Sequence, residues 1–327
     1  MDKYIFCISA FLFCLITTIL IERRLIPALS VRARQPIYED GPKWHLSKTG
    51  TPTMGGIAFL ISMSVAMLVC SLILIVSDIN KKAGISLLLA TLFAIFNSLI
   101  GIFDDLMKLH RNKNAGLTPT QKLVLQFFIS VIFLMARKHF LDDGSTVHIL
   151  TKELDFGVFY YPLAIILLLG VVNCANLTDG IDGLATSVAI AIGVTFLLIG
   201  YSISYSTPII ASAMVGGGCG FLFFNVNPAK IFMGDTGSLF LGAVAVGLAF
   251  SLERPLLIIP IGIVYVIEGL SVILQVLVYK ATKERLFKMA PLHHHMEKCG
   301  LTENQICIIA VITTLVFSAV TILLSRN

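Results

Sequence analysis

Residues 54–77 read MGGIAFLISMSVAMLVCSLILIVS, a run that contains no charged side chain. A helix that crosses the hydrocarbon core of a bilayer needs about 20 mostly apolar residues, so this run is long enough to span a membrane. Further apolar runs of similar length lie at roughly residues 4–21, 84–103, 117–136, 158–175, 183–200, 207–226, 236–252, 255–279 and 305–325. The sequence therefore predicts an all-α, polytopic integral membrane protein with about ten transmembrane helices.

The composition of the chain excludes a water-soluble domain. Of its 327 residues, 57% are hydrophobic and only 13% are charged, and the mean hydropathy is +0.91. Soluble domains carry about 25% charged residues. The cysteines form no C-x-x-C pair and lie mostly within apolar runs, which argues against a disulfide framework or a thiolate metal site. No repeat or linker divides the chain, so residues 1–327 are predicted to form one domain.

The positively charged residues predict which connections face the cytoplasm. Alternate connections hold 16 of the 24 lysines and arginines, at residues 22–53, 104–122, 176–182, 227–235 and 280–304. Basic loops stay on the cytoplasmic side, so these connections are predicted to be cytoplasmic and both termini to lie outside the cytoplasm. The net charge of +5 follows from this bias and gives no reason to expect nucleic-acid binding. Within the last connection, residues 280–289 mix basic and apolar side chains, which is typical of a helix along the membrane surface.

Five aspartates gather at this predicted cytoplasmic face: Asp104, Asp105, Asp179, Asp182 and Asp235. Acidic residues at the ends of spanning helices are costly and need a reason. A helix cap or a solvated loop would explain any one of them, whereas five together favour a shared site. Mg2+ prefers carboxylate oxygens and commonly bridges one or two of them to substrate phosphates. The pattern therefore predicts a site for a metal ion and phosphate groups.

Basic side chains at the same face could contact phosphate oxygens. Lys48 precedes a glycine-rich turn, and Lys122 enters the fourth apolar run, although positive-inside bias and snorkelling would explain them as well. His293, His294 and His295 are consecutive, so they cannot share one helix face, which argues against a three-histidine metal centre. A nucleotide or phosphate contact and a plain solvated loop both fit these histidines.

Two polar residues lie inside the ninth apolar run. Glu268 and Gln275 are about two helical turns apart, so both project from similar faces of that helix. An acid inside a membrane span is a functional candidate by general rule, whereas isolated buried polar residues also serve helix packing. Both interpretations of Glu268 stay open.

Several motifs together resemble one enzyme family. They are KTGTPTMGG at 48–56, GIFDD at 101–105, NCANLTDGIDGL at 173–184, FNVNPAKIFMGDTGS at 224–238 and PLHHHMEKCG at 291–300. In this order and spacing they are similar to those of the bacterial phospho-N-acetylmuramoyl-pentapeptide transferases, and the resemblance covers essentially the whole chain. It implies a ten-helix fold in the bacterial inner membrane with the active site at the cytoplasmic face. It also implies Mg2+-dependent transfer of phospho-MurNAc-pentapeptide from UDP-MurNAc-pentapeptide to undecaprenyl phosphate, which gives lipid I and UMP.

The resemblance also implies catalytic roles at the matching positions. Asp104 and Asp105 would lie at the lipid phosphate, where Asp104 deprotonates or orients that group. Asp235 would be the Mg2+ ligand, and Asp179 would belong to the nucleotide and metal surround. Direct attack by the lipid phosphate on the β-phosphorus is favoured over a covalent phospho-aspartate on Asp104, and the sequence does not choose between them.

The remaining matching positions would bind substrate. They are Lys48, Lys122, Asn176, Asp182, Asn225, Phe232, Gln275, His293, His294 and His295. Among them, Phe232 would stack on the uracil and Lys48 would contact the nucleotide. Lys122 and the histidines match positions linked to the diphosphate and the donor sugar. Leu301 and Phe224 stand where many members carry tryptophan, which puts only details of the cytoplasmic loop in doubt.

Three rival functions share some of these features. A related transferase that moves N-acetylglucosamine 1-phosphate from its UDP sugar to a polyprenyl phosphate would share the aspartates but not the form PLHHHMEKCG. An ion-coupled transporter would place its acids near the bilayer midplane rather than at one face. A non-catalytic scaffold would not need the acidic cluster. The glycine-rich and terminal helices are compatible with a homodimer.

Overall fold

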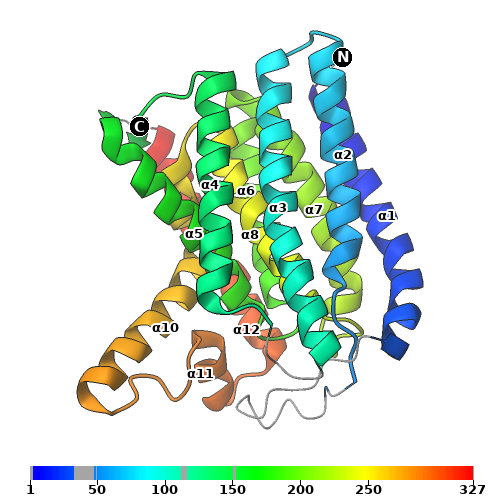
Figure 1. Ribbon diagram of the computed structural model, residues 1–327, viewed down its shortest axis with the longest axis vertical. Coiled ribbons are helices and arrows are strands. Elements are labelled where there is room, and N and C mark those ends of the chain that lie inside the picture. Colours follow the sequence, from blue (N-terminus) through cyan, green and yellow to red (C-terminus); the bar gives the residue numbers. More distant parts are fainter. Residues whose placement is uncertain (1–2, 33–47, 49, 112–115, 150–151, 327) are drawn as a thin grey trace.

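The computed structural model describes residues 3–32, 48, 50–111, 116–149 and 152–326. Within these residues ten helices are long and apolar enough to cross a membrane, which confirms the predicted fold class. The helices that contain these spans are α1 (Lys3–Arg32), α2 (Gly56–Val76), α3 (Lys81–Arg111), α4 (Pro119–Leu141), α5 (Tyr160–Thr178), α6 (Leu184–Ile203), α7 (Ser206–Asn225), α8 (Gly234–Ser251), α10 (Ile263–Thr282) and α12 (Glu303–Arg326). Most of them run roughly parallel in one bundle, from which α10 and α11 project (Figure 1).

The ninth span differs from its predicted bounds, residues 255–279. Pro255–Leu257 form a short 3-10 helix, η3, and Ile258–Ile261 form a single helical turn, α9. Proline has no main-chain N–H, so Pro255 and Pro260 cannot donate to a continuous helical ladder. The chain turns at Gly262, and the spanning helix α10 begins only at Ile263.

The connection after α10 also differs from its prediction. Lys283 adopts a left-handed conformation with φ of 63°, which ends α10 at Thr282. Residues 284–290 form no helix, so the surface helix predicted over residues 280–289 is wrong. A short helix, α11 (Leu292–Lys298), follows and carries the three consecutive histidines.

A small hairpin between α4 and α5 was not predicted. Strands β1 (Thr146–Ile149) and β2 (Lys152–Asp155) pair in antiparallel fashion, with Val147 opposite Leu154. A 3-10 turn, η2 (Gly157–Phe159), then leads into α5. Thr146–Ile149 (TVHI) alternates polar and apolar residues, but four residues are the shortest pattern that indicates a strand, and Lys152–Asp155 (KELD) does not alternate.

Helix α8 is the core of the bundle. Nearly all of its residues are buried, and it packs against α2, α3, α5 and α7 (Figure 1). Its sequence is rich in glycine, alanine and serine, and such small residues let neighbouring helix backbones approach closely. One such close approach is to α3, where a Cβ built on Gly101 would overlap the main-chain carbonyl of Asp235. This contact brings the end of α3 onto the start of α8.

The peripheral helices expose apolar side chains where lipid would contact them. Examples are Ile132 on α4, Ile166 on α5, Ile273 on α10 and Leu323 on α12, each more than half exposed. Both ends of the chain lie at the end of the bundle opposite α11 (Figure 1). The described chain therefore begins and ends at the same end of the bundle, as an even number of spans requires.

Candidate active site

Three carboxylates meet where the end of α3 packs on the start of α8. Asp104 and Asp105 belong to α3, and Asp235 lies in the first turn of α8. One oxygen of each lies within 4.8 Å of the other two, which is close enough for a shared metal ion. Asp104 and Asp105 are buried and Asp235 is half-buried. The structure thus brings together three of the five predicted aspartates.

Asp105 also fixes the start of α8. Its carboxylate accepts hydrogen bonds from the Thr236 N–H at 2.9 Å, the Thr236 hydroxyl at 2.7 Å and the Asp235 N–H at 3.2 Å. The first N–H groups of a helix have no partners within that helix. In α8 the carboxylate of Asp105, from the neighbouring helix α3, accepts two of them. Asp105 therefore holds the main chain of Asp235 at a set distance from α3.

Two lysines neutralise part of this acidic cluster. Lys122 Nζ lies 2.5 Å from Asp235 Oδ2 and 3.1 Å from Asp104 Oδ1. Lys108 Nζ lies 2.6 Å from Asp104 Oδ2 and 3.3 Å from Asp235 Oδ2. Lys108 was not predicted as a site residue, although its place one helical turn after Asp104 could have indicated it. Three carboxylates against two ammonium groups leave a site that favours a further cation.

The local sequence at the start of α4 places Lys122. Thr118 caps the helix by accepting a hydrogen bond from the Gln121 N–H at 3.2 Å, and the Gln121 side chain accepts one from the Thr118 N–H at 2.9 Å. Pro119 occupies the first helical position, where its missing N–H costs nothing. This reciprocal cap begins the helix at Pro119 and sets Lys122 in its first turn. The Leu117 N–H, just before the cap, donates to Asp104 Oδ1 at 2.7 Å.

Asn176 and Asp179 come from the end of α5. The Asn176 side-chain amide donates to Asp235 Oδ1 at 3.1 Å and to the Ser238 hydroxyl at 2.7 Å, so Asn176 joins the cluster. Asp179 follows the last residue of α5 and lies outside the three-carboxylate group. Burial raises the pKa of the Asp179 carboxyl well above its usual range, and the charge of Asp235 raises that pKa further.

Lys48 and Asp182 form a second cluster with a residue that was not predicted, Glu303. Lys48 Nζ lies 2.7 Å from Asp182 Oδ1 and 2.6 Å from Glu303 Oε1. Glu303 also accepts a hydrogen bond from the Asp182 N–H at 2.8 Å. The other Asp182 oxygen accepts from the Asn227 side-chain amide at 3.0 Å and the Ala229 N–H at 2.9 Å. In the sequence Glu303 looks like an ordinary acid in the first turn of a helix. Nothing in the sequence indicates that it belongs to a site and does not simply stabilise the start of that helix.

Asn225 and Phe232 shape the turns beside this second cluster. Asn225 is buried, accepts a hydrogen bond from the Gly183 N–H at 3.1 Å and donates one to the Ile231 carbonyl at 2.9 Å. Phe232 is half-buried. Its N–H donates to the Pro52 carbonyl at 2.9 Å, and its carbonyl accepts from the Gly55 N–H at 2.9 Å. The segment before α2 therefore runs alongside the segment before α8.

Gln275 and the three histidines have separate partners. Gln275 Oε1 accepts a hydrogen bond from the Phe287 N–H at 2.8 Å. His293 is fully buried and contacts Glu268, whereas His294 Nδ1 lies 2.6 Å from Glu297 Oε2. His295 Nδ1 accepts from the Lys288 N–H at 3.1 Å. The ring nitrogens of the three histidines thus bond to different groups, although the rings of His293 and His294 are in contact, with centroids 4.2 Å apart.

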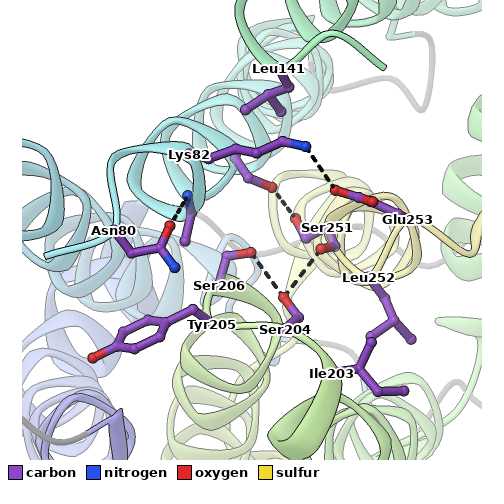
Figure 2. A pocket seen from close by; sticks show the side chains of 12 residues that line it. Asn80, Lys82, Leu141, Ile203, Ser204, Tyr205, Ser206, Ser251, Leu252 and Glu253 are labelled. Carbon is purple, nitrogen blue, oxygen red and sulfur yellow. Dashed lines mark hydrogen bonds and ion pairs between the residues drawn. The ribbon is translucent and has the colours of Figure 1, made fainter. Parts of the chain in front are cut away.

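A cavity of about 240 Å3 lies at the opposite end of the same helices (Figure 2). The starts of α3 and α7 and the end of α8 line it with polar side chains, among them Lys82, Ser204 and Glu253. Figure 2 shows Lys82 paired with Glu253, with Nζ 3.6 Å from Oε1, and Ser204 bonded to Ser206 and Ser251. None of the predicted site residues lines this cavity.

Two stretches of the chain match models of known protein families. A family model described as glycosyl transferase family 4 matches residues 85–253, and a phospho-N-acetylmuramoyl-pentapeptide-transferase signature matches residues 48–60. A phospho-N-acetylmuramoyl-pentapeptide-transferase of Clostridium perfringens is 40% identical over 295 residues, which is 90% of each chain. The chain belongs to the phospho-N-acetylmuramoyl-pentapeptide-transferase family.

Other members of this family are similar to the same extent. The transferase of Clostridium kluyveri is 42% identical over 300 residues, 89% of this chain and 92% of that relative. That of Halalkalibacterium halodurans is 41% identical over 297 residues, 90% of this chain and 89% of that relative. The predicted resemblance is therefore confirmed. The two family matches include all five predicted aspartates, Lys122 and Lys48.

Proposed function

We propose that the protein transfers phospho-MurNAc-pentapeptide from UDP-MurNAc-pentapeptide to undecaprenyl phosphate, giving lipid I and releasing UMP. One observation carries this proposal: Asp104, Asp105 and Asp235 share a site with the ammonium groups of Lys108 and Lys122. Membership of the family supports it. A reaction between two phosphate-bearing substrates needs such a site, because the reacting groups repel each other.

The donor set fits Mg2+. Carboxylate oxygens are the hard ligands that this ion prefers, and three of them lie within 4.8 Å of one another. Asp235 would hold the ion, with Asp104 and Asp105 beside it. When bound, Mg2+ would neutralise charge on the diphosphate and favour the departure of UMP.

The protein's own side chains would do the remaining work at the reacting phosphates. Lys108 and Lys122 offer positive charge to the diphosphate oxygens, and Asp104 orients the lipid phosphate. An oxygen of the lipid phosphate forms a new bond to the β-phosphorus of the donor, while the bond from that phosphorus to the bridging oxygen breaks. The electron pair leaves with UMP.

The surroundings of Asp104 support direct transfer over a covalent phospho-aspartate. Its carboxylate is buried and is bound by Lys108, by Lys122 and by the Leu117 N–H. Each of these contacts stabilises the carboxylate anion, which lowers its reactivity as a nucleophile. Direct attack by the lipid phosphate does not require the Asp104 carboxylate to act as a nucleophile.

The nucleotide would bind beside the second cluster. Phe232 stacks on the uracil in this proposal, and Asn176, Asn225, Gln275, His294 and His295 line the donor pocket. His293 matches the same motif but is fully buried, so it would support the pocket from behind without lining it. Lys48 supports this pocket through Asp182 and Glu303, since both carboxylates contact its ammonium group. Lys48 would therefore affect nucleotide binding partly indirectly, because it holds the turn that carries Asp182.

The same proposal covers location and assembly. The protein would lie in the bacterial inner membrane as one domain, residues 1–327, with the site at the cytoplasmic face and both termini on the other side. The excess of lysine and arginine in the connections near the site supports this orientation. A homodimer is compatible with the exposed apolar faces of the outer helices.

The test is UMP release by purified protein in detergent, with Mg2+ and a polyprenyl phosphate. UDP-MurNAc-pentapeptide is expected to be turned over and UDP-N-acetylglucosamine is not, and EDTA is expected to stop the reaction. Turnover of the second donor would instead assign the chain to the related N-acetylglucosamine 1-phosphate transferases. Well-folded protein inactive with both donors would contradict the proposal.

A further inference from the structure

Glu268 and His293 form a buried pair that the proposed reaction does not use. Glu268 lies in α10 with 4% of its surface exposed, and His293, in α11, has none. The Glu268 carboxylate accepts a hydrogen bond from the His293 main-chain N–H, at 3.2 Å to Oε1 and 3.3 Å to Oε2. Oε2 also lies 3.1 Å from the ring nitrogen Nδ1. A single carboxylate thus holds both the backbone and the ring of His293.

The first turns of α10 give Glu268 a fixed base. The Tyr265 hydroxyl donates to the Ala185 carbonyl of α6 at 3.1 Å, and Gly269 packs against Cys174 of α5. Beyond these turns α10 leaves the bundle, and α11 lies near its base beside α12 (Figure 1). Glu268 therefore ties the returning segment of chain to the part of α10 that is anchored.

The far edge of the His293 ring contacts the turn after α5. Nε2 is buried and has no hydrogen-bond partner among the described residues. A Cβ built on Gly180 would overlap this nitrogen, so the ring lies directly against the Gly180 main chain. Gly180 follows Asp179, whose carboxyl belongs to the predicted catalytic set. A carboxylate only accepts hydrogen bonds, so a bond from Nδ1 to Glu268 needs a ring proton on Nδ1, and the tautomer with no proton on the other nitrogen fits the unpartnered Nε2.

We infer that Glu268 is a positioning residue: it fixes the orientation and tautomer of His293, and the ring of His293 supports the Gly180 turn that carries Asp179. His293 then acts from beneath the site and does not touch substrate, unlike the more accessible His294. The expected effect of Glu268 on kcat rests on the proposed function. The expected effect of Glu268 on the tautomer of His293 does not. The two consequences are tested by separate measurements.

The structural consequence is tested by NMR on protein labelled with 15N in its histidines. The His293 signals are assigned by their loss in the His293→Asn variant. Wild-type protein is expected to show a proton on Nδ1 and none on Nε2. In Glu268→Gln the side-chain amide can donate to Nδ1, so the proton should move to Nε2 and the two nitrogen shifts should exchange. Ring signals that do not change without the carboxylate would overturn the inference.

The kinetic consequence is tested by the UMP-release assay on Glu268→Gln. We expect kcat to fall about 10- to 100-fold, as for other residues that orient a functional group, with the donor KM changed less than about 3-fold. The matched control is Glu253→Gln at the opposite end of the bundle, which should behave as wild type. A raised KM at unchanged kcat would overturn the inference, because it would indicate a substrate contact. Wild-type protein inactive with the donor would refute the proposed function alone, while the NMR result would still stand.

A second variant covers the case in which Glu268→Gln folds poorly. His293→Asn keeps a donor toward Glu268 but lacks the ring edge that reaches Gly180, so it should reproduce the loss of kcat. If the two residues act as one unit, the double variant should lose no more activity than the worse single variant. Losses that multiply in the double variant would show that they act independently, contrary to the inference.

Discussion

Lys122, in the first turn of α4, places its ammonium nitrogen 2.5 Å from Oδ2 of Asp235, in the first turn of α8. The same nitrogen lies 3.1 Å from Oδ1 of Asp104 on α3. Lys122 therefore joins α4 to both α3 and α8, at the point where the carboxylates of α3 and α8 meet. The ion pairs are partly shielded from water, so they are screened less by salt than surface pairs are.

Replacing Lys122 by methionine keeps the length of the side chain and removes its charge. We expect kcat to fall at least about 100-fold, because fixed positive charge at a transferring phosphoryl group is worth about that much or more. Lys138→Met, in the same helix but exposed at the other end, is the control and should keep wild-type activity. Steady-state UMP release measures both. Near-normal turnover by the Lys122 variant would remove this lysine from the mechanism.

Asp235→Asn tests the metal site. The substitution keeps the shape of the side chain and removes the charge that would hold Mg2+, so turnover should be lost at every Mg2+ concentration while the protein stays folded. Activity is measured across a Mg2+ titration, alongside a thermal unfolding curve. Asp142→Asn, at the far end of α4, is the matched control. Recovery of the rate at saturating Mg2+ would contradict the assigned role.

Gly101→Ala tests the contact between α3 and α8. The added methyl group would meet the Asp235 carbonyl, so the two helices must separate and the three carboxylates must move apart. We expect a lower thermal midpoint and a loss of activity. Gly170→Ala in α5 is the control, since a Cβ there meets nothing within 4 Å. Equal behaviour of the two variants would argue against the close packing.

Asp179→Asn should make the protein more stable while impairing its activity. The pKa of this carboxyl is raised on folding by burial and by the neighbouring Asp235, Asp105 and Asp182. The charged form is therefore disfavoured in the folded state, and wild-type stability is lost as the pH rises above the ordinary pKa of aspartate. The difference in thermal midpoint between variant and wild type should grow with pH. A difference that is constant with pH would show that the charge of Asp179 is not the cause.

Lys48→Met should destabilise the protein by about 2 kcal/mol, because it leaves Asp182 and Glu303 without their shared cation. Lys48→Arg should restore most of this loss. The exposed Lys81→Met is a control for the removal of a lysine. Thermal unfolding in detergent compares the three variants with wild type. Unchanged stability of Lys48→Met would mean that the lysine serves the nucleotide alone.

The bundle could be predicted because hydropathy records which segments contact lipid. The apolar runs and the basic loops sufficed for ten spans and for a face that holds all five aspartates. The interruption before α10 was missed because Pro255, Pro260 and Gly262 carry no charge and lie among leucines and isoleucines, so the averaged hydropathy of the run stays high. Hydropathy does not record the missing proline N–H groups that break the helix.

The contacts within the site could be predicted only in part. Asp104, Asp105 and Asp235 were grouped by topology, but no spacing rule indicates that Glu303 would reach Lys48 across most of the chain. The sequence also could not show which of the three consecutive histidines is buried, since successive helical side chains point in different directions. Only packing decides that His293 is buried and that His294 is nearer to solvent.

The pairing of Lys48 with Glu303 has a consequence for how the protein is made. The ribosome delivers Lys48 before the second span and Glu303 only with the last one, so the contact forms after nearly every helix has entered the bilayer. Until then Asp182 lacks one of the partners that hold its turn, and the donor pocket is incomplete. A chain halted before α12 would therefore carry Asp104, Asp105 and Asp235 without the complete cluster of Lys48, Asp182 and Glu303.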